Sequence, residues 1–137
     1  MGVQPVWSSF LYLTQAWPDP HHPPFVNAAM RIETTLAPSA LLDALETVEC
    51  SFGRTRGTPN APRTLDLDLL DYNSLVQVGP PILPHPRMHE RRFVLEPLAD
   101  IVPDWYHPVL GITLGEMLAV LPKPEKLSAR LAQGLWG

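Results

Sequence analysis

The sequence is poor in cysteine and in long apolar runs, and its charge is not basic. Cys50 is the one cysteine among 137 residues, which excludes a disulfide framework; we expect it to be a small buried residue of a helix. No apolar run approaches the roughly 18 residues of a membrane span, and no leader segment is recognisable, so we expect a cytoplasmic protein without membrane contact. The net charge of −4 argues against a general nucleic-acid surface.

Apolar residues and proline are plentiful. An apolar content of 45% over residues 1–137 predicts a single domain with one core. Ten of the seventeen prolines gather at residues 18–24, 59–62 and 80–86, which predicts ordered loops there. His21 and His22 lie in the first loop. Without a third ligand nearby, exposed loop residues are a simpler interpretation than a metal site.

The order of the predicted elements indicates an α+β fold. Residues 6–14 and 25–35 read as strands, and Val26, Ala28, Met30 and Ile32 of the second strand should share its apolar face. Pro38 should begin a helix that runs to about Cys50. Residues 90–99 should form a short helix interrupted by Pro97, and residues 113–116 a capping box before another helix. Helices would then pack on one face of a largely antiparallel sheet.

Residues 63–70 are the most informative stretch. A strand here would turn Leu65, Leu67 and Leu69 toward a core and place Asp66 and Asp68 together on the other face. Adjacent carboxylates repel each other, and Mg²⁺ is usually held by one or two carboxylates plus substrate phosphates. Taken alone, the pattern fits a metal site and a solvated acidic face equally well.

Arginines surround this pair. Six of the ten basic residues are arginines between positions 54 and 92, and the planar fork of arginine matches phosphate oxygens. A polyphosphate held as its metal complex fits both features, whereas the alternative is a set of solvated loop charges.

Four blocks in order resemble the 6-hydroxymethyl-7,8-dihydropterin pyrophosphokinase family of the folate pathway. Residues 62–70 resemble its signature, residues 84–95 its next block, and residues 12–14 and 25–29 its substrate side. The resemblance spans about residues 7–122 and leaves 123–137 as a tail. It implies a ferredoxin-like α+β sandwich and an enzyme that transfers the diphosphate of ATP to the hydroxymethyl group of a reduced pterin, releasing AMP.

The resemblance also implies roles for particular residues. Asp66 and Asp68 would hold two Mg²⁺ ions that bridge the ATP phosphates. The other roles fall into three groups: catalytic residues Arg54, Arg56 and Arg63; ATP-binding residues Glu49, Arg63, His85 and Arg91; and pterin-binding residues Thr14, Phe25, Asn27 and Phe93.

The chain also departs from the family pattern. Family members begin with a further strand and helix that have no counterpart in residues 1–5, so the sequence predicts an N-terminally truncated fold with exposed strand edges and a possible homodimer through such an edge. Asn60 stands where an aromatic residue often lies near the nucleotide. The alternatives are a non-catalytic relative that binds Mg-ATP or acts as a partner subunit, and an unrelated scaffold whose arginines bind an acidic protein.

Overall fold

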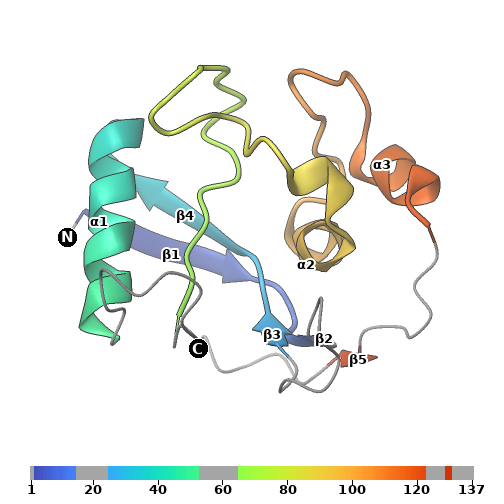
Figure 1. Ribbon diagram of the computed structural model, residues 1–137, viewed down its shortest axis with the longest axis horizontal. Helices are drawn as coiled ribbons and strands as arrows, with labels where there is room; N and C mark the ends of the chain where they lie inside the picture. The colour runs from blue at the N-terminus through green and yellow to red at the C-terminus, as the bar shows by residue number, and fades with distance from the viewer. Residues whose placement is uncertain (1, 15–24, 53–64, 123–128, 131–137) are drawn as a thin grey trace.

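The computed structural model describes residues 2–14, 25–52, 65–122 and 129–130. Within these residues, none of the helices is both long and apolar enough to cross a membrane. Figure 1 shows helix α1 at one end of a strand pair, at the left of the view, and helices α2 and α3 beyond its other end, at the right.

The strands form two small antiparallel sheets. Strand β1 (Val3–Ser8) pairs with β4 (Met30–Thr34), and β2 (Tyr12–Thr14) lies between β3 (Phe25–Asn27) and β5 (Ala129–Arg130). The predicted strands at 6–14 and 25–35 are therefore each divided in two. The α+β class is confirmed.

Both predicted strands break at the same level of their antiparallel pairing, at Ser9 and Ala29. Ser9 is fully buried and exchanges two hydrogen bonds with Ala29: its amide donates to the Ala29 carbonyl, and its hydroxyl accepts from the Ala29 amide, each at 2.9 Å. Asp100 then holds the next residues, because its Oδ2 accepts from the Phe10 amide at 3.2 Å and from the Tyr12 hydroxyl at 2.7 Å. A side chain that replaces a ladder partner in this way ends regular pairing.

The break changes which residues of the second strand are buried. Met30, Arg31 and Ile32 alternate as predicted, with Arg31 exposed. Val26 was expected on the apolar face, but its side chain is 56% exposed, because residues 28–29 interrupt the alternation and the buried position falls on Ala29.

Three α-helices follow in the part of the chain that the structure describes. Helix α1 (Pro38–Ser51) begins with Pro38 in its first turn as predicted, and buries Leu41. Cys50 was expected to be buried but is exposed, since it lies on the outer side of this helix. A short 3₁₀ turn, η1 (Met88–Glu90), leads into α2 (Arg92–Ile101), and α3 (Leu114–Val120) comes last.

Helix α2 is not interrupted by Pro97, contrary to the prediction. Pro97 lies inside the helix and is buried. Thr113 caps α3 as predicted: its hydroxyl accepts from the Glu116 amide at 3.2 Å and donates to Glu116 Oε1 at 3.3 Å. Arg92 joins the two helices, because its Nη2 donates to the carbonyls of Leu118, Leu121 and Pro122 at the end of α3.

The main core lies between these helices and the break in the strands. It contains Ala29 from the break, Met88 from η1, two leucines of α2 and two residues of α3. The buried members are Ala29, Met88, Leu95, Leu98, Leu114 and Met117.

Residues 65–70, called here the aspartate segment, were predicted to be a strand. The backbone is extended and the burial alternates, with the leucines less exposed than the aspartates, but the segment pairs with no strand of the described residues. In Figure 1 it is the green strip that runs from the region of α1 toward the upper loops. A turn follows the segment, in which the Leu75 amide donates to the Tyr72 carbonyl at 2.8 Å.

His107 is a buried histidine that closes the loop before α3. Its side chain is 4% exposed, and Nδ1 accepts from the amides of Val109 at 3.2 Å and Leu110 at 3.0 Å. Burial lowers the pKa of His107, His89 lowers it further, and Asp71 opposes the shift. A proton on Nδ1 would remove both hydrogen bonds, so the native protein needs neutral His107.

We predict that the protein loses stability as the pH falls. The native pKa of His107 is below 6.5, so near and below that pH the unfolded chain binds more protons, and the free energy of unfolding decreases toward low pH. Denaturant unfolding at pH 7.5 and 5.5 measures this difference. His107→Asn keeps an acceptor near Nδ1 without a titrating ring and should reduce the pH dependence; an unchanged dependence in the variant would contradict the assignment.

Candidate active site

The aspartate segment is held at two points. Glu49 is 4% exposed at the end of α1, and its Oε2 accepts from the Leu67 amide at 2.8 Å. The Leu70 carbonyl accepts from the His85 amide, also at 2.8 Å. Asp66 and Asp68, on either side of the first anchor, are exposed on one side of the extended chain, as the alternation predicts. The two carboxylates are thus placed side by side by a backbone that is fixed between them at Leu67 and after them at Leu70.

His85 lies beside Asp68 and two arginines. Burial lowers the pKa of His85; Asp68 opposes the shift, while Arg91 and Arg87 reinforce it. The imidazole is therefore neutral at pH 7. Its Nδ1 accepts from the Arg87 amide at 3.2 Å, which leaves the ring proton on Nε2 as a hydrogen-bond donor.

Arg91 and Phe93 flank Arg92, the first residue of α2, at the turn from η1 into this helix. The Arg91 guanidinium lies 5.7 Å from the centroid of the Phe93 ring, a cation–π arrangement. The Phe93 side chain is 42% exposed, so its ring remains accessible for a second flat group. This turn therefore carries a cation for an anionic ligand and an aromatic surface next to it.

The residues predicted to bind a pterin lie on two paired strands and on α2. The ladder places Thr14 opposite Phe25 and Tyr12 opposite Asn27. Helix α2, which begins next to Phe93, contacts both of these strands. The backbone thus brings Thr14, Phe25, Asn27 and Phe93 toward the region where strands β2 and β3 meet helix α2.

Three predicted catalytic residues, Arg54, Arg56 and Arg63, fall outside the described residues, as do His21, His22 and Asn60. Among the residues that are described, no group of three or more His, Cys, Asp or Glu side chains comes together as a metal cage. Asp66 and Asp68 instead provide two adjacent carboxylates, the complement that Mg²⁺ takes when phosphates supply further ligands.

Comparison with known proteins identifies the family. The family model described as 7,8-dihydro-6-hydroxymethylpterin-pyrophosphokinase (HPPK) matches residues 2–103. The chain belongs to the HPPK family. The expected resemblance over residues 7–122 is thus confirmed at the level of the family.

Relatives in bacteria and fungi resemble this HPPK-family chain. It is 42% identical over 113 residues to a 2-amino-4-hydroxy-6-hydroxymethyldihydropteridine pyrophosphokinase of Pseudomonas aeruginosa, covering 82% of this chain and 69% of that one. A Synechocystis protein of the same name is 37% identical over 118 residues, covering 85% and 60%. The folic acid synthesis protein fol1 of Pneumocystis carinii is 37% identical over 114 residues, covering 82% and 15%. The chain therefore spans less than two thirds of the length of several relatives that it matches.

Sequence reasoning did not assign a site role to Arg87 or Asp100. Arg87 was noted only as one of six arginines, yet it acts electrostatically on His85. Asp100 was not singled out, yet it holds Tyr12 of strand β2 from α2. Arg87 lies two residues from His85 in the sequence, and this spacing could have predicted their interaction. No local pattern links Asp100 to a strand residue 88 positions earlier.

We predict that Glu49 stabilises the aspartate segment. Glu49→Ala removes the acceptor of the Leu67 amide, and a hydrogen bond to a charged group contributes about 1.5–3 kcal/mol. The free energy of unfolding should fall by about that amount, and exchange of the Leu67 amide should accelerate. Glu46→Ala, at an exposed position of the same helix, should change stability by no more than about 0.5 kcal/mol. Equal losses in both variants would assign the effect to the helix rather than to the anchor.

Proposed function

We propose that this chain transfers diphosphate from ATP to the hydroxymethyl group of 6-hydroxymethyl-7,8-dihydropterin, releasing AMP, in folate biosynthesis. The observation that carries the proposal is the fixed pair Asp66 and Asp68 with His85 and Arg91 at its side. Family membership and the names of the relatives support the same reaction.

The two carboxylates are proposed to hold two Mg²⁺ ions together with the ATP phosphates. Asp66 and Asp68 are exposed, so a hydrated ion reaches them from solvent, and their mutual repulsion disappears when it binds. A metal ion in such a site neutralises charge on the transferring group.

The nucleotide is proposed to lie along the positive side of the aspartate segment. Arg91 supplies a fixed charge, and neutral His85 donates a hydrogen bond from Nε2 to a phosphate oxygen. Glu49 acts on the nucleotide side by holding Leu67, and Arg63 completes this ATP-binding set. Arg54, Arg56 and Arg63 are proposed to stabilise the charge of the transition state, which is the main task of a protein in phosphoryl transfer.

The pterin is proposed to bind between the paired strands β2 and β3 and the start of α2. Phe93 offers an exposed ring face, Phe25 provides the second aromatic group, and Asn27 and Thr14 read the hydrogen-bonding edge of the heterocycle. The pterin hydroxyl would then face the phosphates held at the aspartate segment.

The reaction predicts a clear result for Asp68→Ala. The protein should release AMP from ATP only when 6-hydroxymethyl-7,8-dihydropterin is present, and the variant should lose on the order of 10²–10³-fold in rate because charge stabilisation is lost. Chromatographic quantification of AMP measures this, and Asp104→Ala, at an exposed position, is the control. No AMP from folded protein, together with Mg²⁺-dependent stabilisation by ATP, would favour a non-catalytic relative that binds Mg-ATP.

Further proposals concern the organisation of the chain. We propose that residues 1–137 form a single domain and that the protein is cytoplasmic.

A homodimer is proposed through the outer edge of β1. This edge pairs with no other strand in the described part of the chain, and Trp7 of β1 is 58% exposed. Sedimentation equilibrium should give a dimer mass that Trp7→Lys reduces to that of a monomer; a monomer at all concentrations would exclude the dimer.

A further inference from the structure

Asp100 joins helix α2 to strand β2. It lies in the last turn of α2, and its Oδ2 accepts hydrogen bonds from the Phe10 amide at 3.2 Å and from the Tyr12 hydroxyl at 2.7 Å. Tyr12 is 5% exposed, so its hydroxyl is largely shielded from solvent. A shielded contact of this kind holds the two elements at a fixed separation, because breaking it leaves a donor without an acceptor.

The strand side of this contact belongs to the face that carries the proposed pterin ligands. Directly opposite residues of an antiparallel pair share a face, and Tyr12 is opposite Asn27. Alternate positions of a strand also share a face, which places position 14 of β2 and position 25 of β3 on that same face. Because the Tyr12 hydroxyl reaches Asp100, this is the face that β2 turns toward α2.

The helix side of the contact carries Phe93 in a similar way. Phe93 and Asp100 are seven positions apart in α2, which is close to two full turns, so both lie on one face of the helix about 10 Å apart along its axis. Leu98 belongs to the main core. A rotation or shift of α2 would move the Phe93 ring relative to Asn27, and the hydrogen bonds of Asp100 resist that movement.

We propose that Asp100 is a positioning residue for the pterin, because it fixes the separation between the ring of Phe93 and the polar groups of Asn27 and Thr14. This inference rests on the proposed function and adds a residue that acts through β2 rather than by touching a substrate. A flat heterocycle bound between an aromatic ring and polar edge groups needs both at set distances, since its stacking and hydrogen-bond contacts form together.

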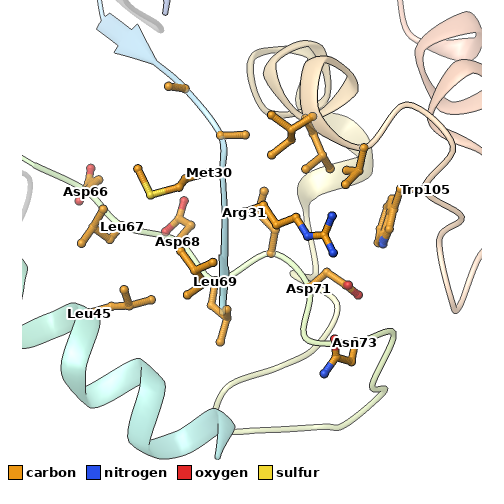
Figure 2. Close-up of a pocket in the computed structure, with 17 residues that line it drawn as sticks. Met30, Arg31, Leu45, Asp66, Leu67, Asp68, Leu69, Asp71, Asn73 and Trp105 are labelled. Atoms are coloured by element: carbon orange, nitrogen blue, oxygen red, sulfur yellow. The ribbon is translucent and has the colours of Figure 1, made fainter. Parts of the chain in front are cut away.

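The phosphate side of the site is held by other contacts. Figure 2 shows Asp66 and Asp68 on the aspartate segment, at one side of a cavity of about 360 Å³. This segment is anchored by Glu49 of α1 and by the backbone of His85, both of which lie outside α2. Loss of Asp100 should therefore weaken the pterin and leave the affinity for ATP nearly unchanged. That difference separates positioning from a general loss of structure.

The test compares Asp100→Ala with Asp100→Asn in steady-state AMP release and in binding of 6-hydroxymethylpterin, the fluorescent oxidised form of the substrate. A misplacement of about 1 Å in a site costs on the order of 10²-fold, so Asp100→Ala should raise both the pterin KM and the Kd of the probe at least about tenfold. The ATP KM and kcat should change by less than about threefold. Asp100→Asn keeps an oxygen acceptor and should recover most of the lost affinity.

Further variants show whether the effect passes through this contact. Tyr12→Phe removes the phenolic hydroxyl, keeps the Phe10 contact and should raise the same two constants by about threefold or more. Combined with Asp100→Ala it should add little, because both changes act on one contact. Glu96→Ala removes an ion pair to Arg92 within α2 and should leave pterin affinity unchanged. Circular dichroism confirms folding, and where Asp100→Ala does not fold, Tyr12→Phe carries the same decision.

The positioning role and the reaction fail in different ways. An unchanged probe Kd in Asp100→Ala, an equal loss of affinity in Glu96→Ala, or an ATP KM that rises as much as the pterin KM would overturn the positioning role. If the wild type releases no AMP but binds the probe in a manner that depends on Asp100, the reaction is wrong and the positioning role stands. If it releases pterin-dependent AMP and the pterin KM is the same in Asp100→Ala, the positioning role alone is wrong.

Discussion

The position of the aspartate segment is the constraint on which the site depends. Two carboxylates one residue apart are useful to a metal ion only if the backbone between them cannot turn. In this protein that backbone is held by Glu49 at the Leu67 amide and by the His85 amide at the Leu70 carbonyl. The first anchor belongs to α1 and the second to the loop before η1, so the parts of the fold on both sides of the segment determine where Asp66 and Asp68 lie.

The charged groups around this segment act in opposite directions on the protonation of His85. Burial lowers the pKa of His85, and the neighbouring Arg91 and Arg87 lower it further, whereas Asp68 raises it. The lowering effects are the larger ones, so the ring is neutral at pH 7. A neutral ring donates to a phosphate oxygen without adding another charge beside the arginines. Arg91 meanwhile lies over Phe93, so that one side chain connects the proposed phosphate and pterin regions.

Local patterns predicted the local structure well. The alternation of leucine and aspartate gave the correct exposed face at residues 65–70, Pro38 marked the start of α1, and Thr113 with Glu116 marked the cap of α3. Each of these depends on residues within one turn or one strand. The Asp66 and Asp68 arrangement was predictable for the same reason.

The features that the sequence did not predict depend on distant residues. The two strand breaks arise from hydrogen bonds between Ser9 and Ala29 and from Asp100, none of which are neighbours in the chain. Helix α2 continues through the buried Pro97, so the local tendency of proline to end a helix did not decide where this helix ends. Likewise, alternation predicts an extended backbone but does not determine whether a neighbouring strand pairs with it. The aspartate segment therefore has the burial pattern of a strand but belongs to neither sheet of the described residues.

That last difference bears on the metal site. The proposed Mg²⁺ ligands Asp66 and Asp68 lie side by side only while the backbone of the aspartate segment stays extended. Within the described residues no neighbouring strand holds that backbone, and the hydrogen bonds from the Leu67 amide to Glu49 and from the His85 amide to the Leu70 carbonyl hold it instead. Each such hydrogen bond restricts the backbone before a ligand binds, so it reduces the entropy that metal and nucleotide binding must otherwise remove.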